Sequence, residues 1–132
     1  MILVDTSVIL DVIEDDAQWA DWSQRQLDRA TLNDGLCINA VIYAELSIAY
    51  ARIEELESML ATASLAVEPI PREALFLAGK AFVRHRRKRG AKTGVLPDFF
   101  IGAHAAVAGI PLLTRGAARY RTYFPKLTLI AP

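Results

Sequence analysis

Three acidic residues stand alone in long apolar stretches of this 132-residue sequence. With His104 taken as neutral, they are the only charged residues within residues 1–10, 35–51 and 93–114: Asp5, Glu45 and Asp98. A carboxylate in such surroundings must be protonated, paired or bound to a metal ion, because an unpaired buried charge is costly. No basic residue lies nearby in sequence, and oxygen ligands without His or Cys favour Mg²⁺ or Mn²⁺. Such an ion activates water and stabilises a charged leaving oxygen.

Each acid also has an ordinary structural interpretation. Asp5 could cap a helix that begins at Thr6 or Ser7, and Asp98 could be a helix N-cap, since Asp is favoured there. Glu45 could occupy an exposed position on an amphipathic helix. No single acid decides the question, but one lone acid in each of three apolar segments is a more specific pattern.

Short apolar runs alternate with longer helical patterns along the chain. We expect strands at residues 1–4, 36–38, 65–67, 111–114 and 127–130. We expect helices at residues 6–12, 16–32, 40–51, 52–63, 72–89, 97–107 and 117–123, with Thr6 or Ser7, Asn39 and Gly90 among their end residues. This alternation predicts an α/β fold with a mainly parallel sheet covered on both faces, in one domain over residues 1–132.

The carboxyl ends of the strands are where an open parallel sheet places its ligand crevice. Asp5 follows the first predicted strand, and Thr114 and Arg115 end a later one, so all three should face that crevice. The hydroxyls of Ser7 and Thr114 could orient water there.

The net charge of zero conceals a division along the chain. Residues 1–70 hold 13 acidic and three basic residues, a net charge of −10, and residues 71–132 carry +10. Six cations gather in nine residues: Arg84, Arg86, Arg87, Lys88, Arg89 and Lys92. Solvated helix faces would explain part of this asymmetry, but clustered Lys and Arg favour a surface that contacts the phosphates of a nucleic acid. Arg115 could hold a scissile phosphate, or form a salt bridge with an acid of the first half.

Other features narrow the location and the class of the protein. The single cysteine, Cys37, excludes an internal disulfide. The sequence has neither a secretory signal pattern nor an apolar stretch of the ~20 residues that a membrane span requires, so we expect a cytoplasmic protein without membrane contact. His104, Trp19 and Trp22 are interpreted as core or interface residues.

The motifs around the three acids resemble a known family. The segment from Asp5 to Asp11 is similar to the opening of a PIN domain, Asn39–Leu46 to its second motif and Leu96–Ile101 to its third. Leu113-Thr114-Arg115 with the following Tyr120 and Tyr123-Phe124-Pro125 resembles the closing segment. The resemblance spans the whole chain and is greatest to VapC-type toxins of toxin–antitoxin pairs. It implies a three-layer α/β/α fold, an endoribonuclease dependent on Mg²⁺ or Mn²⁺, a homodimer and a cognate antitoxin, with Asp5, Glu45 and Asp98 as the acidic site.

One position departs from the family pattern. A further Asp commonly follows the Thr-Arg of the last motif, and here that position is Gly116. The main alternative to an enzyme is therefore an impaired module of the same fold that binds RNA or a partner protein. A phosphotransfer receiver domain is a third interpretation, but the acidic pair and phosphoacceptor Asp that it needs are absent after the first and middle strands.

Overall fold

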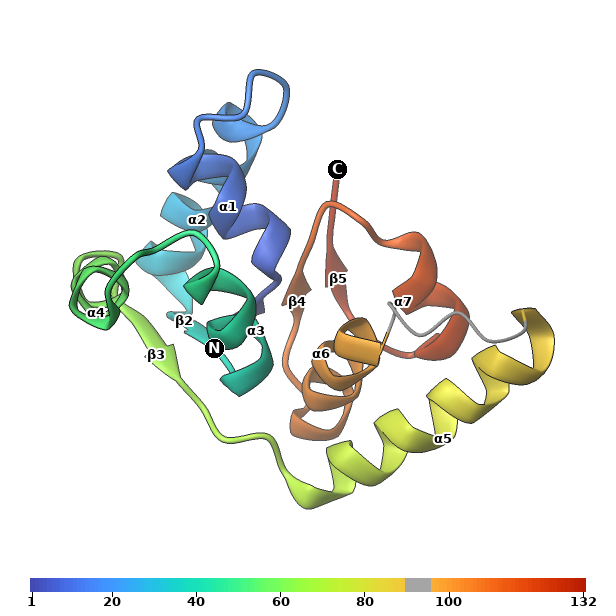
Figure 1. Cartoon of the computed structure of the whole chain (residues 1–132). Helices are drawn as coiled ribbons and strands as arrows, with labels where there is room; N and C mark the ends of the chain where they lie inside the picture. Colours follow the sequence, from blue (N-terminus) through green and yellow to red (C-terminus); the bar gives the residue numbers. More distant parts are fainter. Residues whose placement is uncertain (90–95) are drawn as a thin grey trace.

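A parallel sheet forms the centre of the computed structural model, which describes residues 1–89 and 96–132 (Figure 1). Within these residues the strand order is β3-β2-β1-β4-β5. The strands are β1 (Ile2–Val4), β2 (Leu36–Ile38), β3 (Leu65–Val67), β4 (Leu112–Leu113) and β5 (Leu129–Ile130). Leu3 pairs with Cys37 on one side and with Leu112 on the other, so β1 is the middle strand.

Helices on both faces of the sheet bury the apolar strands. They are α1 (Thr6–Ile13), α2 (Ala20–Asn33), α3 (Ala40–Ser47), α4 (Ile53–Thr62), α5 (Arg72–Arg89), α6 (Leu96–Ala108) and α7 (Ala118–Tyr123). The long helix α5 packs against α6, and α6 in turn contacts α3 and α7 (Figure 1). The α/β fold with a parallel sheet covered on both faces is thereby confirmed.

The core is continuous through the sheet. Leu3, Val4 and Leu113 are fully buried, as is Phe99 on α6. The Phe99 ring packs edge to face against Tyr123, with ring centroids 4.9 Å apart, and so ties α6 to α7. Full burial of one such side chain is worth about 1.5–3 kcal/mol. The helices that carry the candidate site are therefore fixed by the core beneath it.

Several element boundaries differ from the predicted ones. Helix α1 has Asp5, and neither Thr6 nor Ser7, as its N-cap, because the Asp5 side chain accepts a hydrogen bond from the Thr6 amide. The predicted helix 16–32 begins only at Ala20, after Asp16 caps the preceding turn. The helix predicted for residues 40–51 ends at residue 47 and is followed by a turn. The predicted end at Gly90 lies outside the described residues.

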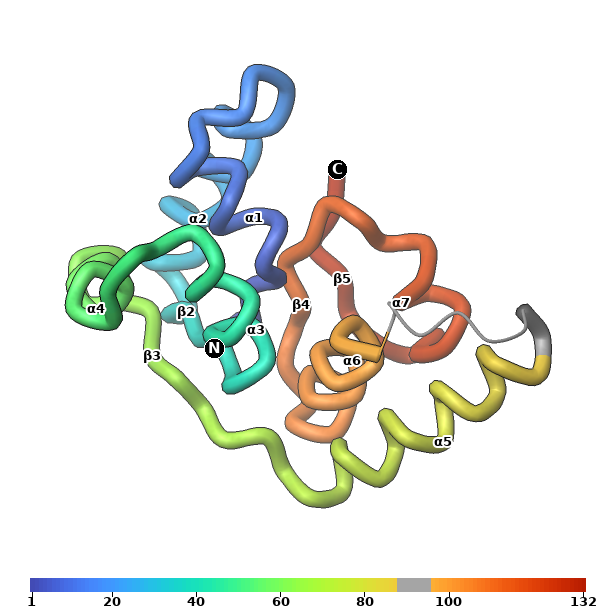
Figure 2. The backbone as a smooth tube through the Cα atoms, viewed as in Figure 1, coloured from blue at the N-terminus to red at the C-terminus, as the bar shows by residue number. Residues whose placement is uncertain are grey.

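Sequence-distant segments meet at the middle of the sheet. The first residues of α1 follow β1, and the loop before α7 follows β4, its neighbour in the sheet (Figure 2). This is the point where the strand order reverses, and open α/β sheets bind their ligands at such a point. Among the residues that the structure describes, no helix has the length and apolar character needed to cross a membrane.

Candidate active site

Asp5 is buried at the carboxyl end of β1, where one backbone amide and two side-chain hydroxyls donate hydrogen bonds to it. Its Oδ1 atom accepts a hydrogen bond from the Thr6 amide at 2.8 Å. Its Oδ2 atom accepts one from Thr114 Oγ1 at 2.7 Å and one from the Tyr120 hydroxyl at 3.1 Å. Asp5 thus caps α1 and also lines a cavity, so its predicted role as a helix cap does not exclude its predicted place at the site.

Glu45 reaches the same region from α3. It is half-buried, and its Oε1 atom accepts a hydrogen bond of 2.6 Å from Thr6 Oγ1. Thr6 therefore joins two of the predicted acids, since its amide binds Asp5 and its hydroxyl binds Glu45. This contact fixes the orientation of the carboxylate and makes a purely solvated role for Glu45 untenable.

Asp98 comes from the first turn of α6. It is the third residue of that helix and so is not its N-cap. A carboxylate in the first turn is favoured by the positive end of the helix dipole. The Asp98 side chain is 33% exposed and forms an ion pair with Arg119 of α7.

These acids share one cavity of about 690 Å³ at the carboxyl ends of the strands. Its lining consists of Asp5, Thr6, Ser7, Leu10, Glu45, Asp98, Arg115, Gly116, Ala117, Ala118, Arg119 and Tyr120. The structure thus places the three predicted acids, Ser7 and Arg115 around a single space. Thr114 lies fully buried behind it and holds Asp5.

The electrostatics of the cavity favour an added positive charge. Burial raises the pKa of Asp5 from an ordinary value of 3.8 to about 6, and the charge of Asp98 acts in the same direction, against the three hydrogen bonds that lower it. Burial also raises the pKa of Asp98, although Arg119 opposes that change. The pKa of Tyr120 is raised by burial and by the charges of Asp5, Asp98 and Glu45, so the phenol stays protonated and donates.

The donor set suits a hard divalent cation, because all three acids that line the cavity offer carboxylate oxygens. Burial raises the pKa of both Asp5 and Asp98, so a bound cation would offset the cost of keeping these carboxylates ionised. Within residues 1–89 and 96–132, however, no three acidic, His or Cys side chains lie close enough together to form a ready metal site. Instead the guanidinium of Arg119 supplies the cation at Asp98.

Arg115 also lines the cavity and forms an ion pair with a different acid, Asp11. Its Nε atom lies 2.9 Å from Asp11 Oδ2, and its guanidinium lies 5.6 Å from the ring centroid of Trp19. Asp11 is buried and also accepts a hydrogen bond from Ser23 Oγ at 2.8 Å. The salt bridge to an acid of the first half, one of the two roles expected for Arg115, is therefore present.

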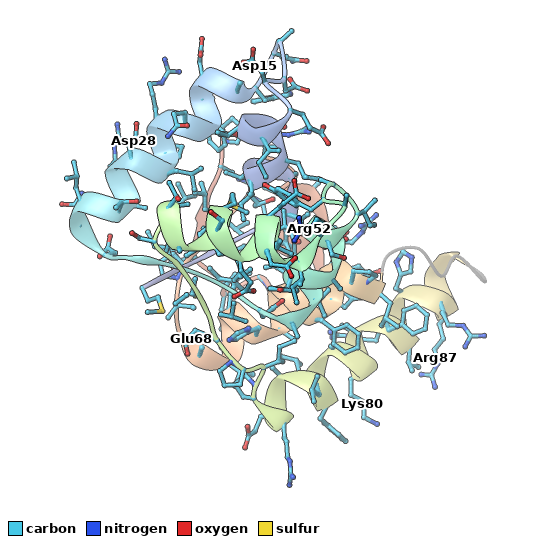
Figure 3. The ribbon with its side chains drawn as sticks, turned by 60° about the vertical axis from the view of Figure 1, so that its left-hand side comes forward. Asp15, Asp28, Arg52, Glu68, Lys80 and Arg87 are labelled. Carbon is cyan, nitrogen blue, oxygen red and sulfur yellow. The ribbon has the colours of Figure 1, made fainter. Side chains whose placement is uncertain are left out.

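The basic cluster of residues 84–92 is described only in part. Arg84, Arg86 and Arg87 are exposed on α5, whereas the side chains of Lys88 and Arg89, and all of Lys92, lie outside the described residues. His85, from the same run, is buried and shares a hydrogen bond of 3.0 Å with the Tyr123 hydroxyl. Figure 3 shows Lys80 and Arg87 at one end of the molecule and Asp15 and Asp28 at the other. These two basic residues of the second half therefore lie away from these two acids of the first half.

Sequence reasoning missed three residues of the site: Thr6, Arg119 and Tyr120. Thr6 was considered only as a helix cap, and Tyr120 only as part of the closing motif. Tyr120 is polar, buried and 115 residues from its partner Asp5, so no local pattern indicates the contact. Arg119 lies in a segment with four cations between residues 115 and 126, and nothing in the sequence singles it out.

His104 has the core position that the sequence predicted. It is buried, and its Nδ1 atom lies 3.1 Å from Asn39 Nδ2, while the side-chain oxygen Oδ1 of Asn39 accepts a hydrogen bond from the Ile42 amide. Burial lowers the pKa of His104, so the ring is neutral and accepts from the Asn39 amide. This contact braces α3 against α6, the helices that carry Glu45 and Asp98.

Comparison with known proteins places these features in a family. Residues 2–125 match the PIN domain. The fold is similar to that of VapBC2 from Rickettsia felis bound to a promoter DNA fragment, with 20% identity, coverage of 100% of this chain and 99% of that chain, and a TM-score of 0.75. It is also similar to a toxin–antitoxin complex from Klebsiella pneumoniae, with 17% identity, coverage of 98% and 96%, and a TM-score of 0.68.

A third similar structure is VapBC-1 from nontypeable Haemophilus influenzae, with 20% identity, coverage of 99% and 98%, and a TM-score of 0.70. A search of curated protein sequences found no matching relative. Because the family match covers nearly the whole chain, the protein belongs to the PIN domain family. PIN domains are generally nucleases that use divalent metal ions, which agrees with the carboxylates around the cavity.

Proposed function

We propose that this protein is a metal-dependent endoribonuclease and the toxin of a toxin–antitoxin pair. The observation that carries the proposal is the single cavity lined by Asp5, Glu45 and Asp98. Asp5, Glu45 and Asp98 are the residues that would hold one or two Mg²⁺ or Mn²⁺ ions. Such an ion supplies an activated water and charge stabilisation for phosphodiester hydrolysis. We also propose that residues 1–132 act as one domain.

The chain's own residues prepare this site. Thr114 and Tyr120 both donate to Asp5 Oδ2, so they keep the carboxylate turned in one direction. Thr6 does the same for Glu45. Hydrogen bonds of this kind orient acidic ligands, and their loss typically lowers metal affinity or activity by about 10- to 100-fold. These hydrogen bonds fix the direction of two carboxylates that line the cavity.

RNA is the proposed substrate because cations cluster near the end of α5. Helices α5 and α6 pack together, and the basic end of α5 precedes in sequence the start of α6, where Asp98 lies. Arg84, Arg86 and Arg87 are exposed there and would contact the phosphate backbone, as clustered cations do. We propose the same role for Lys88, Arg89 and Lys92.

A partner protein is proposed from the surface and from the similar structures. Large apolar side chains are exposed on separate elements: Leu32 is 86% exposed, Ile48 87% and Phe76 70%. Exposed apolar side chains that are scattered singly are normal on a protein surface, so the similar structures carry more weight here. Several of the similar folds come from VapBC or toxin–antitoxin complexes. We therefore propose that a cognate antitoxin and a second copy of this chain cover parts of this surface, in the cytoplasm.

The decisive test measures RNA cleavage by the purified wild type and by Asp5→Asn and Asp98→Asn, with EDTA, Mg²⁺ or Mn²⁺. We expect metal-dependent cleavage by the wild type, and a loss of at least about a hundredfold in each variant, the scale on which lost metal ligands and their supports act. Asp21→Asn is the matched control, since Asp21 is exposed on α2 and outside the cavity. Cleavage by both site variants at the wild-type rate, in preparations free of contaminating ribonuclease, would refute the proposal.

A second function is favoured by one observation. Gly116 lines the cavity in place of the further acid that the family commonly carries, and Arg119 already neutralises Asp98. An impaired PIN module would bind RNA or its partner protein without turnover. Binding of RNA without cleavage at any Mg²⁺ or Mn²⁺ concentration would favour this alternative over the nuclease.

A further inference from the structure

The ion pair between Arg119 and Asp98 lies inside the candidate active site. Asp98 comes from α6 and Arg119 from α7, and both side chains line the cavity. A divalent cation held by Asp98 would occupy the position that the guanidinium of Arg119 now neutralises. Two cations at one carboxylate repel each other, so the metal ion and Arg119 compete for Asp98.

The pair is suited to exchange. The side chains of Asp98 and Arg119 are 33% and 39% exposed, and ion pairs with this much solvent around them contribute little to stability. The backbone under Arg119 is held in place, because the next residue, Tyr120, is buried and donates to Asp5. Only the long side chain of Arg119 has to move when the pair opens.

The second cation of the cavity is held differently. Arg115 contacts both carboxylate oxygens of Asp11, at 3.1 and 2.9 Å, and Asp11 is buried. Its guanidinium also packs over Trp19. Among the cavity-lining residues that the structure describes, Arg119 is therefore the cation whose partner is itself a candidate metal ligand.

We propose that Arg119 is an internal competitor of the metal ion: it neutralises Asp98 when no metal is bound, and it is released toward the phosphate of the nucleic acid when Asp98 takes the metal. This inference rests on the proposed function and names one residue with two alternating partners. A guanidinium suits both, because it binds carboxylate and phosphate oxygens through the same planar set of donors.

The two roles predict changes of opposite sign in one variant. In Arg119→Gln, the competing charge is gone, so Mn²⁺ binds more tightly by about three- to tenfold, or about 0.6–1.4 kcal/mol. The same variant loses a phosphate contact, so the KM for RNA rises. A merely structural role would weaken both the binding of Mn²⁺ and the binding of RNA.

The experiment titrates wild type, Arg119→Gln, Arg119→Lys and Arg121→Gln with Mn²⁺ and follows free Mn²⁺ by electron paramagnetic resonance. Arg121 is exposed on the same helix and outside the cavity, so its variant controls for net charge. Arg119→Lys keeps the positive charge and should bind Mn²⁺ much as the wild type does. Circular dichroism checks that each variant is folded.

A double-mutant cycle locates the effect at the ion pair. If Arg119 competes for Asp98, then Arg119→Gln tightens Mn²⁺ binding in the wild type but changes it little in an Asp98→Asn background. Tighter Mn²⁺ binding that persists unchanged in Asp98→Asn would overturn the inference, because the effect would then come from general charge.

The failures of the two proposals are distinguishable. If the wild type binds Mn²⁺ and cleaves RNA while Arg119→Gln binds Mn²⁺ equally or more weakly, the inference on Arg119 is overturned and the nuclease proposal stands. If neither the wild type nor Arg119→Gln binds Mn²⁺, both proposals are overturned. Tighter Mn²⁺ binding with a raised KM for RNA supports the inference.

Discussion

Replacing Asp5 by Asn should stabilise the metal-free protein at neutral pH. Asp5 is only 8% exposed, and burial raises its pKa from 3.8 to about 6. Each pKa unit corresponds to about 1.4 kcal/mol, so keeping Asp5 ionised above pH 6 costs the folded state about 3 kcal/mol. Asn carries no charge and avoids this cost.

The hydrogen bonds of Asp5 reduce the expected gain. Asp5 accepts at both carboxylate oxygens, at Oδ1 from the Thr6 amide and at Oδ2 from Thr114 and Tyr120, whereas an Asn side chain has only one acceptor oxygen. Losing one or two such bonds costs about 1 kcal/mol each. We therefore expect Asp5→Asn to be about 1–2 kcal/mol more stable than the wild type at pH 7.5 in EDTA.

The stability that Asp5 contributes should fall as the pH rises. The folded state holds a proton on Asp5 up to about pH 6, whereas the unfolded chain releases it near pH 4. The folded state therefore binds more protons in this window, and the stability contributed by Asp5 is complete below pH 4 and is lost as the pH rises to 6. The advantage of Asp5→Asn should appear over the same window and be absent at pH 3.5.

Urea unfolding in EDTA, followed by the fluorescence of Trp19 and Trp22, measures the difference at a series of pH values. Comparing two variants at each pH removes the titration of the other acids. An Asp5→Asn variant that is less stable than the wild type at pH 7.5, or a difference that does not change between pH 4 and 6, would contradict the reasoning. Asp21→Asn, at an exposed position, should show no such change.

Three further changes test other parts of the site. Gly116→Asp should keep the fold, because a Cβ atom at Gly116 meets no other atom within 4 Å, and it should raise metal-dependent cleavage about tenfold, measured as kcat/KM. Arg115→Met should lower the free energy of unfolding by about 2 kcal/mol or more, since buried Asp11 loses its ion pair, and chemical denaturation measures this. Gly102→Ala should lower the free energy of unfolding by about 1–3 kcal/mol in the same assay and should also slow cleavage. The reason is that its Cβ atom would lie 2.5 Å from the Phe124 ring and displace α7. A Tm equal to that of the wild type would show instead that the ring moves freely.

Much of the fold was predictable because its strands are short and fully apolar. Residues 36–38 and 65–67 were predicted with the bounds that the structure shows, since Gly and Pro residues or turns delimit them. Helix ends were less predictable. Ile48 is 87% exposed just beyond the end of α3, and apolar residues at exposed positions resemble a continuing helix in the sequence.

The acids of the site could be predicted because isolation among apolar residues is a local signal. The residues that hold them gave no such signal. Tyr120 and Thr114 contact Asp5 across 115 and 109 residues, and only the pairing of β1 with β4 brings them there. The choice between two partners for Arg115 likewise depended on where Asp11 lies in space.

The central position of β1 determines when the site can form during synthesis. The ribosome produces β1 and Asp5 early, but their neighbour β4 and the hydroxyls that hold Asp5 come more than 100 residues later. Contacts of such long range form late in folding, because closing the intervening loop costs entropy first. A nascent chain that has not reached residue 120 therefore lacks an assembled acidic cavity. If the protein is the RNA nuclease that we propose, this order keeps the growing chain inactive beside the message that encodes it.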